Sequence, residues 1–126
     1  MMVFLHFFHQ ILLKLPYMIK SADEYLVYNR QGTFLTEKGY LVGLKMKLWQ
    51  FPSAKSIDFP EGYKLSWIVL NLFNKKERIL FDNHNQKPPH YHINDHQEFF
   101  QWKSLTETEE IFWQMVYQKF GYFNYE

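Results

Sequence analysis

The chain has 126 residues, of which 47% are hydrophobic, and this suits one domain that buries a core and argues against disorder. Aromatic residues make up 21% of the sequence, so some rings are expected on a partner surface as well as in the core. A net charge of +1 excludes no class of function, since a local basic face can still bind phosphate. The sequence has no cysteine, which excludes disulfides and cysteine-based zinc sites and fits a reducing cytoplasm.

The first 17 residues, MMVFLHFFHQILLKLPY, form an apolar N-terminal extension. They lack the basic region and the cleavage site of a signal peptide, and they are too short and too often interrupted by polar residues to predict a membrane span. Two interpretations stay open: a helix that docks on the domain, or translated sequence upstream of a start at Met18. We therefore expect an extension over 1–17, a single domain over 18–126, and no membrane segment.

From Glu24 the sequence pattern is typical of a β-sheet. EYLVYNR (24–30) predicts a first strand, and QGT (31–33) is typical of a turn. In residues 40–48 apolar side chains at even positions alternate with others that include Lys45 and Lys47. This period of two predicts a strand with one apolar face and one face that carries lysines.

The middle of the chain predicts a central strand followed by a hairpin. SAKSIDFPEG (53–62) is expected to be a loop, and YKLSWIVLNLF (63–73) is apolar on both faces, as in a central strand. NKK (74–76) is the size of a hairpin loop before a returning strand over 77–82. The segment DNHNQK (82–87) is expected to be a loop because the prolines after it break regular structure.

The end of the chain predicts a helix. Ser104 with Glu107, and Thr106 with Glu109, both have the spacing of a capping box, and Gly121 is a plausible end. The apolar stripe of this helix consists of Ile111, Phe112, Met115 and Val116. The order of elements predicts an α+β fold, with an antiparallel sheet of about four to six strands, a C-terminal helix and, as an option, an N-terminal helix.

Four of the six histidines lie between His84 and His96, around two prolines. If HYHI (90–93) is extended, His90 and His92 point to one face of the strand, and Tyr91 and Ile93 pack on the other. Close to them in sequence are Asp82, Asn83, His84 and Lys87.

This group of residues has the composition of a metal-free site that cleaves RNA. One of His90 and His92 would take the proton of a 2′-hydroxyl and the other would protonate the leaving oxygen, because an ordinary imidazole titrates near neutrality. Lys87 would stabilise the charge of the phosphorane, Asp82 would orient an imidazole, and His84 is a substitute candidate. Asn83 is assigned a structural role. Candidate RNA-binding residues are Lys45, Lys47, Lys64, Arg78 and Tyr91.

Other interpretations of the histidines stay open. A His-x-His pair on a strand also suits a metal, as in cupin-like barrels, with His96 or Glu98 as a further ligand, although the spacings do not match such a motif. The same residues could bind RNA or phosphate without cutting it, or form a solvated loop that has no role.

The segment ILFDNHNQKPPHYHI (79–93) resembles the signature of the TumE-like toxin family of toxin–antitoxin systems. Members show an aromatic–Asp–Asn step, then a lysine, then His-x-His, and the matching residues here are Asp82, Asn83, Lys87, His90 and His92. The similarity spans roughly Glu24 to Phe120. Three positions depart from the pattern: a basic residue frequent in relatives is replaced by Tyr91, and glycines that often flank the lysine are replaced by Gln86 and Pro88.

The resemblance implies a small cytoplasmic toxin of a type II pair, held inactive by a cognate antitoxin and directed at RNA or translation. Residue chemistry adds the expectation of a metal-independent endoribonuclease, a hydrolase that needs no cofactor. A non-catalytic RNA-binding or phosphate-binding module and a metal-dependent enzyme are the alternatives. A homodimer is a further option for the active species.

Overall fold

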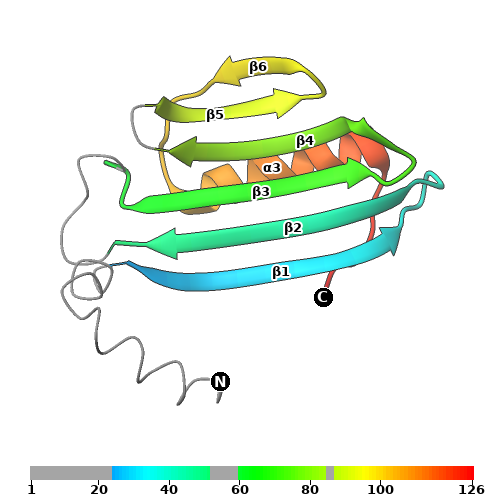
Figure 1. Cartoon of the computed structure of the whole chain (residues 1–126), viewed down its shortest axis with the longest axis horizontal. Coiled ribbons are helices and arrows are strands. Elements are labelled where there is room, and N and C mark those ends of the chain that lie inside the picture. Colours follow the sequence, from blue (N-terminus) through cyan, green and yellow to red (C-terminus); the bar gives the residue numbers. More distant parts are fainter. Residues whose placement is uncertain (1–23, 52–59, 85–86) are drawn as a thin grey trace, which may run out of the picture.

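The structure is a computed structural model that describes residues 24–51, 60–84 and 87–126 (Figure 1). The apolar extension over 1–17, the start at Met18 and most of the loop expected over 53–62 lie outside the described residues.

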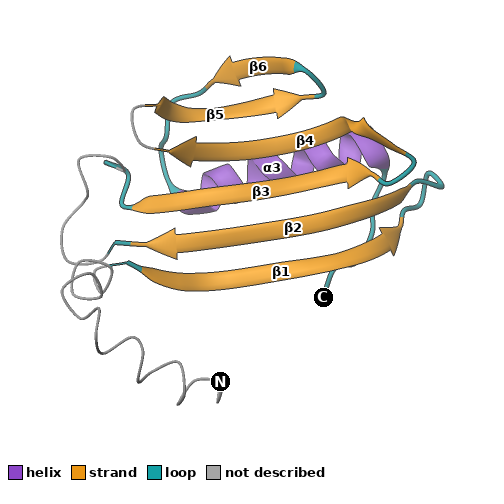
Figure 2. Ribbon diagram, in the orientation of Figure 1, coloured by secondary structure: helices purple, strands orange, loops and turns teal. Residues whose placement is uncertain are grey.

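Six strands form one antiparallel sheet in which each strand pairs with the next one along the chain. Helix α3 (Leu105–Phe120) lies against one face of this sheet, and the other face carries no helix among the described residues (Figure 2). The prediction of an α+β fold with an antiparallel sheet and a C-terminal helix is therefore confirmed. The strands are β1 (Tyr25–Leu35), β2 (Leu41–Gln50), β3 (Tyr63–Asn71), β4 (Asn74–His84), β5 (Lys87–Ile93) and β6 (His96–Phe99).

The core lies between the sheet and α3. Strand β2 shows the predicted alternation, because its even-numbered residues from Val42 to Leu48 are buried while Lys45 is exposed. The Phe112 ring of α3 lies 5.3 Å from the rings of both Trp67 and Phe81, in an edge-to-face arrangement with each. The buried apolar residues are Val42, Leu44, Met46, Leu48, Leu65, Trp67, Val69, Ile79, Phe81, Phe112, Val116, Phe120 and Phe123.

Both ends of α3 follow the sequence signals. The hydroxyl of Ser104 accepts a hydrogen bond from the backbone N–H of Glu107 at 3.1 Å, so Ser104, and not Thr106, is the N-cap. Gly121 ends the helix with φ at 93°, a conformation that favours glycine, and its N–H donates to the carbonyl of Tyr117.

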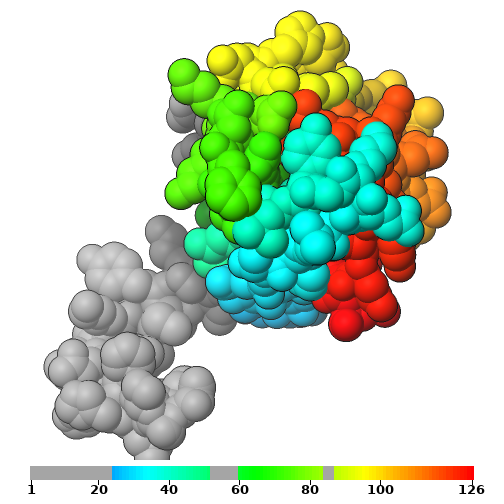
Figure 3. Space-filling view, turned by 90° about the vertical axis from the view of Figure 1, so that its right-hand side faces the viewer, coloured from blue at the N-terminus to red at the C-terminus, as the bar shows by residue number. Residues whose placement is uncertain are grey.

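The β1–β2 turn is tied to the end of the helix. The N–H of Glu37 donates to the carbonyl of Tyr122 at 2.9 Å, and the hydroxyl of Thr36 donates to the carbonyl of Phe120. The turn and the C-terminal segment consequently lie side by side at this end of the molecule (Figure 3). The bond from Thr36 satisfies the carbonyl of Phe120, the last residue of the helix, which has no partner within the helix.

The turn predicted over 31–33 is wrong, since β1 runs through these residues without a break. Gly32 lies opposite Leu44, and a Cβ atom at Gly32 would lie 2.8 Å from the ring of Phe34. The glycine lies in a strand and leaves room for the ring of Phe34, which a larger residue would displace.

The hairpin loop predicted over 74–76 is also wrong, because these residues begin β4. The two-residue loop is Leu72–Phe73, and the side-chain oxygen of Asn71 accepts a hydrogen bond from the N–H of Phe73. Strand β3 is central, but only its helix side is fully buried, with Ser66 exposed on the other.

The loop predicted over 82–87 is largely wrong, since β4 continues to His84 and β5 begins at Lys87. Both prolines are thus inside β5, near its first residue, where a missing N–H costs little. The carbonyl of Pro89 still accepts a bond from the N–H of Phe100.

Candidate functional site on the helix-free face of the sheet

The register of the six strands places one continuous row of polar and aromatic residues on the helix-free face. Residues directly opposite each other in antiparallel strands share a face and touch as side-chain pairs. From β6 to β1 the row consists of Phe99, His90, Asp82, Ser66, Lys47 and Asn29.

A second row runs beside the first, two residues further along each strand. It consists of Gln97, His92, Leu80, Ile68, Lys45 and Gln31. The histidines at one side and the lysines at the other are therefore on the same face, separated by β4 and β3. With a strand spacing of roughly 4.8 Å, His90 and Lys47 lie about 14 Å apart along the row.

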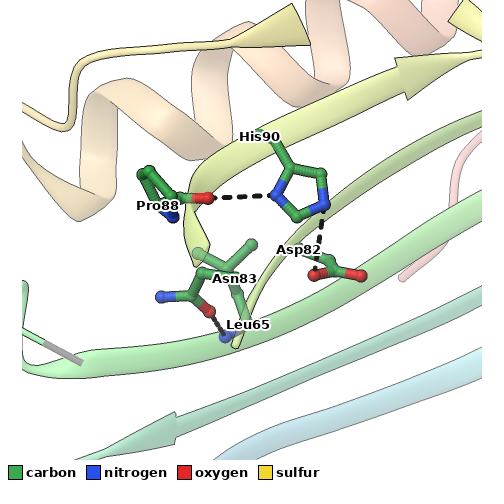
Figure 4. A network of polar contacts seen from close by, with 5 residues as sticks. All are labelled: Leu65, Asp82, Asn83, Pro88 and His90. Atoms are coloured by element: carbon green, nitrogen blue, oxygen red, sulfur yellow. Dashed lines mark hydrogen bonds and ion pairs between the residues drawn. The ribbon is translucent and has the colours of Figure 1, made fainter. Parts of the chain in front are cut away.

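His90 is held firmly on this face, with only 2% of its surface exposed. Its Nδ1 lies 3.0 Å from the carbonyl oxygen of Pro88, and because a carbonyl can only accept, Nδ1 carries the hydrogen (Figure 4). Nε2, which lies 3.7 Å from Oδ1 of Asp82, is then the atom that gains or loses a proton. That oxygen is buried and has no hydrogen-bond partner among the described residues, so the carboxylate of Asp82 lies on the side of the ring that carries Nε2.

His92 lies next to His90, with ring centroids 5.3 Å apart, and is partly exposed. Burial lowers the pKa of His92 below its ordinary value, and the positive charges of His90 and Arg78 lower that pKa further. His92 is consequently neutral near pH 7 and can accept a proton. The two imidazoles thus differ in environment: His90 faces a carboxylate, and His92 faces cations.

Arg78 is the cation that the structure brings closest in register to His92. It lies on the helix-free face, two residues along β4 from Leu80, which is opposite His92. Its Nε donates to the carbonyl oxygen of Asn94 at 3.2 Å, which anchors the guanidinium at the β5–β6 turn. Sequence analysis placed Arg78 only among the RNA-binding candidates, because its position depends on a register that the sequence does not reveal.

Lys87 and His84 lie at the other end of the β4–β5 hairpin, directly opposite each other. The positive charge of Lys87 is the smallest contribution to the lowered pKa of His92. The side chain of His84 lies outside the described part of the chain. Arg78 therefore lowers the pKa of His92 more than Lys87 does.

Tyr91, a candidate for contact with RNA, lies on the helix side of the sheet and not on the face that carries His90 and His92. It lies opposite Phe81, and the two rings stack at 5.3 Å on the helix side of the sheet. The ring of Phe100 lies 6.0 Å from Tyr91 on the same side. The expectation from strand alternation, that Tyr91 packs while its neighbouring histidines point away, describes this geometry.

Asn83 joins β4 to the beginning of β3. Its side-chain oxygen accepts from the N–H of Leu65 at 2.8 Å (Figure 4). Its side-chain nitrogen donates to the carbonyl of Tyr63 at 2.9 Å. Direct pairing of β3 with β4 starts at Ser66 and Asp82, and beyond it the amide of Asn83 takes the place of backbone hydrogen bonds. The role of Asn83 is therefore structural.

The remaining basic candidates are spread along β2 and β3. Lys45 is exposed and Lys47 is half-buried, and both lie on the helix-free face. The ammonium of Lys64 lies 4.9 Å from the ring centroid of Trp49, its partner across the strands. Lysines therefore line one side of this face over two neighbouring strands.

The order of side chains in the first row argues against a serine nucleophile. Asp82 lies between Ser66 and His90, whereas a triad needs the imidazole between the hydroxyl and the carboxylate. Within the described ranges no three His, Cys, Asp or Glu side chains converge as ligands for a metal ion. His96, on the opposite face, forms a 2.7 Å pair with Glu98 instead.

Comparisons of the chain with protein-family models, with curated proteins and with solved structures gave no match. In the part of the chain that the structure describes, no helix is both long and apolar enough to cross a bilayer.

Proposed function

We propose that the helix-free face of the sheet binds RNA and cleaves it without a metal ion. The observation that carries the proposal is the register, which puts Asp82, His90 and His92 on one face with Arg78 and the lysines of β2. A proton acceptor, a potential proton donor and cations for phosphate are the groups that such a reaction needs.

The reaction is a transesterification at phosphorus. Neutral His92 takes the proton of a 2′-hydroxyl, the 2′ oxygen attacks the neighbouring phosphorus, and Arg78 stabilises the additional negative charge. The bond from phosphorus to the 5′ oxygen then breaks, and the protonated form of His90 gives its proton to that oxygen. The products are a 2′,3′-cyclic phosphate and a 5′-hydroxyl.

A second candidate function is RNA or phosphate binding without cleavage, and the burial of His90 favours it. At 2% exposure the ring meets a leaving oxygen only after a neighbouring side chain moves. The two functions differ in their dependence on pH. Cleavage by an acid and a base gives a bell-shaped rate profile, whereas binding alone weakens steadily as histidines lose charge.

We further propose that the protein is the toxin of a type II toxin–antitoxin pair, acts in the cytoplasm and is inhibited by a cognate antitoxin protein. The support is the resemblance of Asp82, Asn83, Lys87, His90 and His92 to the TumE-like signature. Four of these five residues contribute to the geometry described above: Asp82, His90 and His92 to the face, and Asn83 to the support of β4.

The test of the enzyme is cleavage of RNA in the presence of a chelator. Wild-type protein should cut RNA, and it should leave DNA and 2′-O-methylated RNA intact because the 2′-hydroxyl is the nucleophile. His92→Gln should abolish cleavage, and His96→Gln, which changes an exposed histidine on the opposite face, should not. Cleavage of the methylated RNA, or equal rates for the two variants, would refute the mechanism.

The test of the toxin is growth of bacteria after induction of the protein without an antitoxin. Wild-type protein should arrest growth, whereas His92→Gln at matched expression should not. If both arrest growth, the toxicity does not come from this face. If neither does, the toxin proposal fails, and the cleavage assay alone decides whether the face has enzymatic activity.

A further inference from the structure

Phe99 is a large aromatic ring that β6 leaves exposed beside the histidines. It is 54% exposed and directly opposite His90, with the two ring centroids 5.7 Å apart. The sequence does not single out Phe99, because the strand that presents it is only four residues long.

The core does not need Phe99, because its neighbour Phe100 packs in its place. The Phe100 ring lies 5.5 Å from Phe81 on the helix side, and its N–H donates to the carbonyl of Pro89. One phenylalanine of the pair thus anchors the chain, and the other remains on the helix-free face. Exposed aromatic rings beside cationic groups are a recurrent feature of surfaces that bind single-stranded nucleic acids, because bases stack on them.

We propose that Phe99 stacks on the base of an unpaired nucleotide next to the scissile phosphate, so that the substrate is single-stranded RNA. This inference rests on the proposed function of the same face. Single-stranded nucleic acids are recognised by bases that stack on aromatic side chains, and only bases outside a duplex have a free face to offer.

The position of Phe99 at the end of the first row sets the path of the strand. Lys47 lies in the same row across four strand spacings, which is about 19 Å at roughly 4.8 Å each. RNA that crosses the face from Phe99 toward β2 would place one base on Phe99 and the reacting phosphate near His92 of the second row and Arg78 beside it. Later phosphates would then lie toward the lysines of β2. Trp49 is less suited to this role, because the ammonium of Lys64 already lies over its ring.

The experiment measures binding of a fluorescent single-stranded RNA of about ten nucleotides, within the range that such grooves accommodate. The RNA is 2′-O-methylated so that it is not cut, and affinity is read from anisotropy. Phe99→Ala should weaken binding about tenfold, as expected for one lost base stack. Phe99→Tyr should retain affinity, and an RNA duplex of the same length should bind wild-type protein at least about tenfold more weakly.

Two further variants make the result specific. Phe73→Ala is the matched control, because Phe73 is 83% exposed in the β3–β4 loop, away from the rows. Phe99→Leu keeps an apolar side chain without a flat ring and should weaken binding as alanine does. Thermal unfolding of each variant shows whether the fold is retained.

The outcomes separate this inference from the proposed function. If RNA binds wild-type protein and Phe99→Ala binds as tightly as Phe73→Ala, the stacking role is wrong while RNA binding stands. Wild-type affinity in Phe99→Leu, or equal affinity for duplex and single strand, would also overturn it. If wild-type protein binds no RNA, both proposals fail.

Discussion

The side chain of Asn83 should contribute more to stability than any other asparagine in the described sheet. It is 3% exposed, and it holds the N–H of Leu65 and the carbonyl of Tyr63 at 2.8 and 2.9 Å. Direct pairing of β3 with β4 begins only at Ser66, so these backbone groups depend on the amide. Asn83→Ala removes both partners at once.

The magnitude follows from the two groups that lose their hydrogen bonds. An unsatisfied buried backbone group costs about 1–3 kcal/mol, so the pair could cost roughly 2–6 kcal/mol. The Leu65 bond is buried and the Tyr63 bond is partly buried, which places the expected loss near 3 kcal/mol. In a domain of this size that corresponds to a fall in melting temperature of at least about 12 °C.

Urea unfolding of Asn83→Ala beside Asn74→Ala tests this prediction. Asn74 also accepts a hydrogen bond, from the N–H of Lys76 at 3.3 Å, but in an exposed hairpin where water replaces it. The control should lose under about 1 kcal/mol. If the two variants unfold within about 0.5 kcal/mol of each other, the account of the buried amide is refuted.

Three features can be tested without a substrate: the lowered pKa of His92, the positive φ of Gly121 and Gly39, and the N-cap of α3 at Ser104. Burial first, then neighbouring charges that include Arg78, hold the pKa of His92 below 6.5, so Arg78→Gln should raise it toward 6.5 in an NMR titration, and an unchanged value would contradict the assignment. Because the folded pKa is depressed, the unfolded chain binds the proton more tightly, and stability should fall as the pH drops from 6.5 through the lowered pKa. His92→Gln should remove this part of the pH dependence in denaturation curves. Gly121→Ala should cost about 2 kcal/mol in thermal unfolding, because φ is 93° and a Cβ atom would lie 2.9 Å from a backbone nitrogen of the β1–β2 turn. Gly39→Ala, with φ at 92° but open space around it, should cost less, and equal losses would show that the contact is unimportant. Ser104→Ala should cost about 1 kcal/mol through loss of the N-cap, and an unchanged melting temperature would exclude that role.

Alternation along single strands was predictable, whereas the pairing between strands was not. The period of two in β2 indicates which residues face the core, and the position of Tyr91 between two histidines indicates opposite faces for these side chains. Whether Lys47 shares a face with His90 depends on three successive registers, and a shift of one residue in any of them would reverse it.

Turns were the weakest predictions, because glycine and polar residues have more than one use. Gly32 lies inside β1 beside the ring of Phe34, and the polar residues 74–76 begin a strand because the hairpin loop is Leu72–Phe73, held by Asn71. The two prolines of β5 are tolerated near its start, between the paired residues Lys87 and His90, where the register gives them no partner on β4. Local composition cannot separate these cases from loops, since each depends on a neighbour in space.

The environments of the two histidines were also beyond the sequence. His90 is buried on the helix-free face, where the rings of Phe99 and His92 lie beside its imidazole. Arg78 on β4 lowers the pKa of His92 on β5, and its guanidinium is anchored by the carbonyl of Asn94. Both facts depend on the β5–β6 turn, where Asn94 adopts φ at 56°.

The rigidity of the site comes from the core on the other side of the same strands. Tyr91, between the two histidines, stacks on Phe81, and Phe81 packs against Phe112 of α3. Each histidine is therefore fixed by a neighbour that points into the core, and the imidazoles lie on a strand with defined pairing on both sides. Groups that act on a reacting atom need such fixed geometry, which strands provide better than loops. We therefore expect the chemistry at the β4–β5 hairpin and not on the lysine side of the face. The lysines of β2 can hold a phosphate in several rotamers, whereas proton transfer requires one fixed position of the imidazole.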